Sequence, residues 1–584
     1  MLRRAYQLGS VIVVAVLALA VTIPIACLVI LGLQTTLGLF KGHLTFQNYT
    51  ALWEQPATRE ALYHTLIFTV GGAVLAVFLG TVMAWAVTSV RIPLRSLFRI
   101  IPICVLILPP LVKDPAMVIL FSPKTGLVNM MMRNTVGFGQ PFNVYSMFGM
   151  IVVIGVFSAP MAYVIMLQPL EGIDRSFIDA SRMSGAPLHR TMFRVVLPMI
   201  RPALLSAVTL LVIVIASAFE TPVIIGIPAG ISTFMSQIYL LMNSPLSGQN
   251  AAAAQGTMYL LLTGIMVVLY LLATRNERRF VAISGRGHQH DLIESRPVRI
   301  VLTVFMVIYG LFAFVGPVVV TVLTSLVPFY SAVNGNPFKH FTGANYTAVF
   351  TTNSVFSGII TSTVLGILVA VGVVIVAGLL AFISLKSKSR FRRLCEAIAM
   401  APIAIPALVY SIGLLLTVLS VPGLASTLYG TKGLLVLAEV IVFLPITMRV
   451  LSSALIQVQD ELIEASTLAG APIGRTIRSV LVPIIRPAML YAVAVVFVYS
   501  YRELGAIIFL VPSNTNVVPN LSFSFWVSGG YPMLSALNMV ALVVPLLIIC
   551  VAMGLSRFGA RVPRPAARVT AARTPIVATE GGTV

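Results

Sequence analysis

The sequence contains one distinctive stretch twice. Residues 179–204 read DASRMSGAPLHRTMFRVVLPMIRPAL, and residues 464–489 read EASTLAGAPIGRTIRSVLVPIIRPAM. The copies lie 285 residues apart and are identical at 13 of their 26 positions. A weaker match at an offset of 297 pairs residues 48–51 with 345–348, and Pro109 with Pro406. The change of offset places about twelve extra residues near 122–144, and the repeat indicates two homologous halves in the same orientation.

The composition excludes a water-soluble protein. Of the 584 residues, 58% are hydrophobic and 9% are charged, against about 25% charged residues in soluble domains. The mean hydropathy is +1.01. Too few polar side chains exist to cover a soluble surface, so a soluble enzyme, a disordered chain and a nucleic-acid-binding domain are excluded. Nucleic acid is therefore not an expected partner, despite the net charge of +21.

Long apolar runs predict an all-α, polytopic membrane protein. A helix needs about 20 mostly apolar residues to cross a bilayer. Twelve runs meet this requirement, six in each half. They lie near 9–33, 62–88, 100–121, 145–169, 203–226, 252–274, 300–326, 354–383, 396–420, 433–456, 488–512 and 536–556.

The basic residues predict the orientation of the chain. Thirty of the 38 Lys and Arg residues fall at the termini or in the even-numbered loops between the runs. Seven fall on the other side, Lys113 among them, and Arg502 lies inside a run. Because cytoplasmic loops carry an excess of Lys and Arg, we expect both termini to be cytoplasmic.

These runs also suggest how the chain is divided. The first half spans 1–274, with a polar loop at 170–202, and the second spans 299–556, with its equivalent loop at 457–487. Residues 275–298 form a basic cytoplasmic linker. The basic tail at 557–584 is predicted to be disordered.

The duplicated loops are too long and too polar to be simple connectors. Their sequence predicts a helix–turn–helix at the membrane surface, with Gly185 and Gly470 permitting a tight turn. Pro187 and Pro472 suit the first position of a following helix. Arg201-Pro202 and the equivalent Arg486-Pro487 are expected to start the next span. Packing of each loop against its own spans is one interpretation, but two equivalent cytoplasmic elements fit a twofold partner better.

The pattern Glu/Asp-Ala-Ser, followed after three residues by Gly-Ala-Pro, resembles the EAA loop of permease subunits in binding-protein-dependent ATP-binding-cassette (ABC) importers. The resemblance implies the type I importer permease fold over nearly the whole chain. It also implies that each loop forms a coupling helix that sits in a cleft of an ATPase subunit. The first copy has Asp where the motif usually has Glu. The matching positions are Asp179, Ala180, Ser181, Gly185, Ala186 and Pro187, and Glu464, Ala465, Ser466, Gly470, Ala471 and Pro472.

The same resemblance implies the partners and the compartment. A permease of the bacterial inner membrane works with two copies of an ATPase subunit and with a periplasmic or surface-tethered solute-binding protein. The chain has no Gly-Lys dipeptide and hence no P-loop. We therefore expect no catalysis and no bound cofactor in this chain, with ATP and Mg²⁺ used by the partner.

General likeness to ferric-iron permeases with two fused halves makes ferric iron the expected substrate. Thiamine, aminoethylphosphonate and other small polar solutes remain alternatives. A secondary transporter can also have two parallel six-span halves, but it needs no docking loops. A membrane enzyme acting on lipid would need a cluster of acids or histidines at one interface, which the sequence lacks.

Ionisable residues inside a span are costly and mark functional sites. Glu220 and Glu503 fall in the outer half of equivalent runs, and we expect them to face each other across the translocation path. Carboxylate oxygens suit a hard cation such as Fe³⁺. Arg502 could neutralise one of them when the path is empty, and Glu439 is a further path candidate. Local hydrogen bonding of the acids near the ends of their spans is the alternative.

Overall fold

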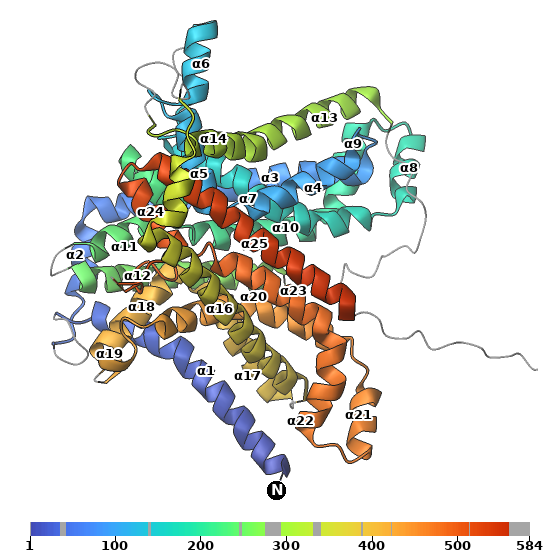
Figure 1. Ribbon diagram of the computed structural model, residues 1–584. Helices are drawn as coiled ribbons and strands as arrows, with labels where there is room; N and C mark the ends of the chain where they lie inside the picture. The colour runs from blue at the N-terminus through green and yellow to red at the C-terminus, as the bar shows by residue number, and fades with distance from the viewer. Residues whose placement is uncertain are drawn as a thin grey trace, which may run out of the picture.

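The computed structural model is built from helices (Figure 1). It describes residues 2–35, 42–137, 142–244, 248–274, 294–330, 340–386, 389–421, 423–512 and 514–559, so most of the linker and nearly all of the tail lie outside the described residues. The first half contains α1 (Leu2–Gly32), α2 (Gln47–Glu54), α3 (Pro56–Ser89), α4 (Arg95–Ile107), α5 (Pro110–Phe121), α6 (Leu127–Val136), α7 (Met147–Glu171), α8 (Arg175–Met183), α9 (Leu188–Thr191), α10 (Leu197–Ala216), α11 (Phe234–Met242) and α12 (Gly248–Thr274).

The second half follows the same order of elements. It contains α13 (Arg296–Gly310), α14 (Gly316–Ser325), α15 (Ala344–Thr351), α16 (Asn353–Lys386), α17 (Ser389–Met400), α18 (Ala407–Ser420), α19 (Leu424–Thr427), α20 (Lys432–Ile456), α21 (Asp460–Leu468), α22 (Ile473–Thr476), α23 (Val482–Ser500), α24 (Val518–Val527) and α25 (Tyr531–Gly559).

The described residues support the expected number of spans. Ten helices are long and apolar enough to cross a membrane, five in each half. Two bent pairs, α4 with α5 and α17 with α18, supply the sixth span of each half. A third bent pair, residues 222–229 with α11, adds a broken segment to the first half. The expectation of about twelve spans is thereby confirmed, although not every span is a straight helix.

Both bent spans turn sharply at a proline. The angle between α4 and α5 is 101°, and the angle between the equivalent segments of the second half is 103°. Pro109 and Pro406, which the weak repeat had paired, stand directly before α5 and α18 with extended backbone angles. Proline has no N–H to continue the helical ladder, and it forces the chain out of the helix. The runs predicted over 100–121 and 396–420 are therefore each a pair of helices joined at a sharp bend.

The spans that follow the duplicated loops begin earlier than the sequence predicted. They run over His189–Ala216 and Gly474–Ser500 rather than from 203 and 488. Arg201 and Arg486 accordingly lie exposed inside a helix and do not start it. One π-helical turn in each half, Met192–Val196 and Ile477–Leu481, carries the helix from the loop into the span. The extra residue in each turn lets the helix continue where a break was expected.

Each half has a core of three helices, and its first helix packs on the other half. In the first half α3 packs on α7 and α10, and in the second half α16 packs on α20 and α23. The α1 helix packs on α18, where Tyr410 donates to the carbonyl of Ala20 at 3.0 Å. In return α14 packs on α5, and Tyr309 of α13 donates to the carbonyl of Val156 at 3.2 Å. This exchange holds the two halves together.

Small residues allow the closest helix approach in the first half. A Cβ placed on Gly80 of α3 would lie 2.5 Å from the Cβ of Ala162 and 2.6 Å from the carbonyl oxygen of Ala159, both on α7. Glycine and alanine at such positions let membrane helices pack backbone against backbone. By contrast, a Cβ on Gly264 of α12 would meet nothing within 4 Å.

We predict that Gly80→Val destabilises the protein while Gly264→Val does not. The added side chain must push two backbones apart, and overpacking of this kind typically costs about 1–3 kcal/mol. Both substitutions place a β-branched residue inside a helix, so Gly264→Val controls for the change in helix propensity. Thermal unfolding in detergent should show a lower Tm for the first variant only. Equal Tm values would contradict the described packing.

Candidate functional site: a buried charge cluster between the halves

Five charged side chains meet where the spans of the two halves break. Glu220 interacts electrostatically with Lys113, Asp114, Arg502 and Glu503, and Arg502 interacts with Lys113 and Glu503. We call these residues the central charge cluster: Lys113, Asp114, Glu220, Arg502 and Glu503. The cluster combines two cations with three carboxylates and draws on both halves of the chain.

Interrupted helices position the two glutamates. Residues 217–219 have left the α10 helix and Glu220 begins the next turn, while Glu503 lies in the irregular segment that follows α23. Irregular backbone at membrane depth is tolerated only where protein or a water-filled cavity surrounds it. The Glu503 carboxylate accepts a hydrogen bond from the N–H of Ala506 at 3.1 Å. The two acids that the sequence places in equivalent runs thus each stand at a break rather than inside a continuous span, and they are close enough to interact electrostatically.

Arg502 is held by the break in the opposite half. In an unbroken helix the carbonyls of Val105 and Leu106 would accept from residues 109 and 110, but both of those are prolines. The carbonyl of Val105 instead accepts a hydrogen bond from the N–H of Leu108 at 3.2 Å. The Arg502 guanidinium donates to the carbonyls of Leu106 at 3.0 Å and Leu108 at 3.4 Å.

The Arg502 guanidinium also stacks on an aromatic ring. It lies 4.5 Å from the centroid of Tyr499, one helical turn earlier on α23. A planar guanidinium can contact a ring face and donate to carbonyls at the same time. In the structure, the residue that was predicted to neutralise an acid satisfies backbone carbonyls that a proline break sets free.

Lys113 and Asp114 are the members of the cluster that the sequence prediction missed. Lys113 had been counted with the outer loops, but it lies on α5, half-buried, with its Nζ 5.3 Å from the ring centroid of Phe157. Asp114 is fully buried and accepts from the Thr221 hydroxyl at 2.8 Å, while its Oδ1 has no hydrogen-bond partner among the described residues. Two adjacent charges within a predicted span were the signal that could have revealed them.

Glu439 lies beside the cluster on α20. It is fully buried, accepts a hydrogen bond from the Ser500 hydroxyl and interacts electrostatically with Glu503. Its Oε1 has no partner among the described residues. The structure thus places all four predicted intramembrane residues in one region.

One member of the cluster, Arg502, borders an apolar cavity between the halves. The cavity has a volume of about 510 Å³ and is lined by α4 from the first half and by α20, α23 and α25 from the second. Along α23 its lining runs from Pro487, near the second loop, to Arg502. The cavity therefore extends from the cluster toward the loops.

Within the described residues, no group of three or more His, Cys, Asp or Glu side chains is placed to hold a metal ion. The cluster therefore offers two glutamates that influence each other electrostatically, with cations close by, rather than a preformed metal centre. Glu220 and Glu503 remain predicted ligands of a passing cation.

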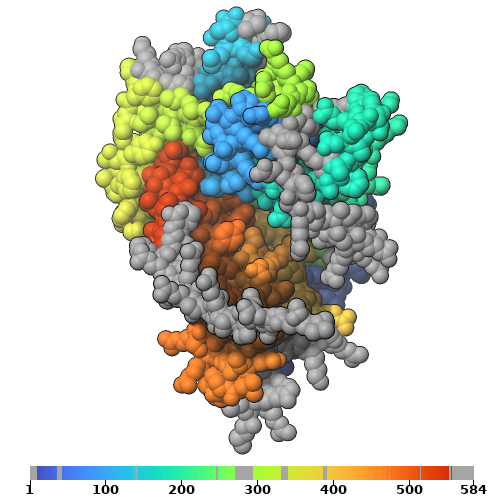
Figure 2. Space-filling view, turned by 90° about the vertical axis from the view of Figure 1, so that its right-hand side faces the viewer, coloured from blue at the N-terminus to red at the C-terminus, as the bar shows by residue number. Residues whose placement is uncertain are grey.

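The duplicated loops have the same structure in both halves. Gly185 and Gly470 have positive φ angles of 78° and 75°, as a tight turn requires, and the short helices α9 and α22 begin directly after the following proline. The hydroxyls of Ser181 and Thr191 bond at 2.9 Å, and those of Ser466 and Thr476 bond at 2.8 Å. Figures 1 and 2 show both loops protruding on one side of the molecule. We call this side the loop face.

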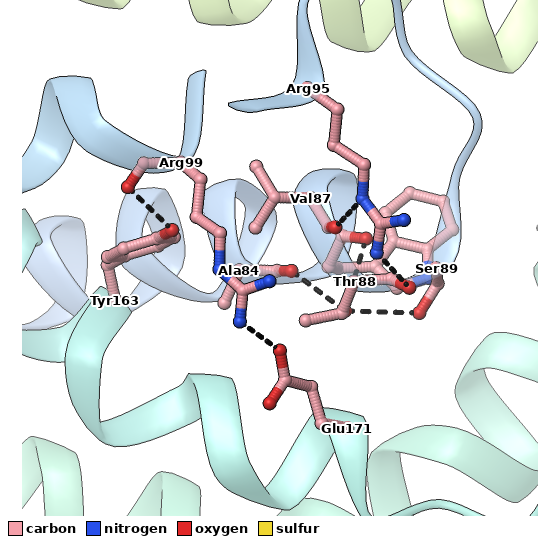
Figure 3. Close-up of polar contacts among 9 residues, drawn as sticks. Ala84, Val87, Thr88, Ser89, Arg95, Arg99, Tyr163 and Glu171 are labelled. Carbon is pink, nitrogen blue, oxygen red and sulfur yellow. Dashed lines mark hydrogen bonds and ion pairs between the residues drawn. The ribbon is translucent and has the colours of Figure 1, made fainter. Parts of the chain in front are cut away.

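Polar contacts connect the first loop to α4, which leads to the cluster (Figure 3). Arg95 donates to the carbonyls of Val87 at 2.5 Å and Thr88 at 3.2 Å, which caps the C-terminal end of α3. Arg99 forms an ion pair with Glu171, the last residue of α7 before the first loop. The end of α7 that leads into the first loop is therefore in direct contact with α4.

The chain belongs to the family of binding-protein-dependent transport system inner membrane components, whose model matches it twice, at residues 76–281 and 374–561. It is thus the permease subunit of an ABC importer, a multi-pass inner-membrane protein from a family of transport components rather than enzymes.

Two curated relatives share the arrangement over most of the chain. The ferric transport system permease protein FbpB of Actinobacillus pleuropneumoniae is 24% identical over 480 residues, which cover 80% of this chain and 67% of that protein. Putative FbpB 1 of Haemophilus influenzae is 24% identical over 450 residues, which cover 74% and 68%. A shorter match, 32% identical over 97 residues, covers 17% of this chain and 33% of a putative 2-aminoethylphosphonate permease, PhnU of Salmonella typhi.

Proposed function

We propose that this permease imports ferric iron, which an external solute-binding protein delivers and two copies of a separate ATPase drive across the membrane. The observation that carries the proposal is the meeting of Glu220 and Glu503, from equivalent breaks in the two halves, in one charge cluster. A hard trivalent cation prefers charged oxygen ligands, and each of these two carboxylates supplies one. The names of the two longest-matching relatives point to the same substrate.

The balance of charge in the cluster supports transient passage of a cation. Lys113 and Arg502 lie beside the carboxylates, so the empty path is nearly neutral within itself. An arriving cation would draw Glu220 and Glu503 away from these partners, and its departure would restore them. Passage without tight retention is what a translocation path requires, because a deep binding site would stop transport.

A second candidate substrate follows from the same cluster. Lys113 and Arg502 could hold the anionic group of aminoethylphosphonate, and a short region resembles a permease named for that compound. Thiamine and other small polar solutes fit the fold equally well. Ferric iron is preferred because the matching position in each half carries an acid.

The twin loops support docking of an ATPase pair and weigh against a secondary transporter. In both halves they present the same helix–turn–helix, with Asp179 and Glu464 exposed. A carrier driven by an ion gradient has no use for two such elements. With the loop face on the cytoplasmic side, as the basic residues predict, both termini are cytoplasmic and ATP with Mg²⁺ is used outside this chain.

The double variant Glu220→Gln/Glu503→Gln tests the substrate path. We expect uptake of radiolabelled ferric iron to be lost, because neutral amides bind a trivalent cation weakly, while the complex still assembles and hydrolyses ATP. Glu54→Gln/Glu60→Gln, which changes two exposed acids, should transport normally. Normal iron uptake by the first variant would remove the proposed path. Uptake of aminoethylphosphonate but not iron by the unmodified complex would move the substrate to the phosphonate.

Gly470→Asp tests the coupling loop. A Cβ at Gly470 meets nothing within 4 Å of the chain, yet its φ is 75°. The variant should fold and still reach the membrane, but fail to link ATP hydrolysis to uptake. Gly423→Asp, with a φ of 87° and equally open surroundings near α19, controls for backbone strain. Equal uptake by the two variants would argue for a transporter that does not use the loop.

A further inference from the structure

The two loops present the same apolar surface. On α8 and α21 the side chains of Phe177 and Leu462 occupy matching positions and are 46% and 44% exposed. Met183 and Leu468, also matched, are 90% and 88% exposed. What sets these side chains apart is that the same two positions are apolar and exposed in both loops. Because their positions and exposures agree, the two loops offer the same apolar contacts to a partner.

The charges around this shared surface differ. Residues 174–183, which include the N-cap Asp174, contain two arginines and two aspartates, a net charge of 0, whereas the matching residues 459–468 contain one aspartate and two glutamates, a net charge of −3. The side chains of Asp179 and Arg182 are exposed on α8, and those of Glu461 and Glu464 are exposed on α21. The apolar positions, the Ala-Ser pair and the turn glycine are kept while the net charge changes by three.

Figure 2 looks onto the loop face and shows the two loops as separate projections, the first in teal and the second in orange. Each is therefore available to its own copy of a partner. If the copies are identical, their grooves carry the same charge. The charge of those grooves then attracts or repels the second loop more strongly than the first.

We propose that the two docking sites are electrostatically unequal, so that one loop holds its ATPase copy more firmly than the other. This inference rests on the proposed docking of two identical ATPase copies. The apolar side chains supply the common part of the binding, and the surrounding charges set the difference. Salt screens exposed charges, so raising its concentration changes the contact of the second loop more than that of the first.

The test compares the two loops in the full complex. A photo-reactive amino acid replaces Met183 in one variant and Leu468 in another, and the yield of cross-linked ATPase is measured at about 0.01 M and about 0.15 M salt. This change shortens the Debye length from about 30 Å to about 8 Å. We expect the ratio of the two yields to change by about twofold or more. A constant ratio would overturn the inference.

A charge-matched variant separates charge from other differences between the loops. Gln459→Asp/Asp460→Arg/Glu461→Ser/Thr467→Arg gives the second loop the ionisable pattern of the first, and its cross-link at position 468 should then follow salt as position 183 does. The reciprocal variant Asp174→Gln/Arg175→Asp/Ser176→Glu/Arg182→Thr should make the first loop behave like the second. Unchanged salt dependence in both would contradict the charge argument. If neither position 183 nor position 468 gives a cross-link to the ATPase when the native charges are kept, the proposed ATPase docking itself is overturned.

Discussion

A proline in the middle of a membrane span frees backbone carbonyls, and no water is present in the bilayer core to satisfy them. Pro109 and Pro110 create this need at the bend between α4 and α5. The guanidinium of Arg502, from the other half, meets it by donating to the carbonyls of Leu106 and Leu108. The requirement for a donor thus fixes a charged residue of the second half against the break in the first. The other charges gather around this contact.

The bent helix α4 lies between the first loop and the cluster. Arg99 of α4 is paired with Glu171, which immediately precedes the first loop, and the far end of α4 stops at the proline break. One helix thus contacts both the segment that enters the loop and, through the carbonyls of Leu106 and Leu108, Arg502. In the part of the chain that the structure describes, the second half lacks this ion pair. The residue that matches Arg99 there is Glu396, and it pairs with Arg392 on its own helix, α17. The two halves are therefore related but not equivalent in their connection to the loops.

Much of this architecture could be read from the sequence. The repeat predicted two halves, the apolar runs predicted the number of spans, and Gly185 and Gly470 predicted the turns. The breaks could not be predicted, because a proline is often tolerated within a membrane helix and only tertiary partners decide whether the chain bends there. Lys113 was counted with the outer side although it falls inside the predicted run 100–121. A pattern of hydrophobicity predicts which segments lie in the membrane, but it does not predict which charged side chains from different segments lie close together.

The central claim is that Glu220 and Glu503 lie opposite each other on the substrate path. The most direct test replaces both with cysteine in a chain whose four native cysteines are alanine, and treats the assembled complex with thiol cross-linkers of graded length. We predict that short reagents join the two positions, that ATP binding changes the yield, and that neither single variant gives the product. Failure of every reagent to join them, with and without ATP, would contradict the account.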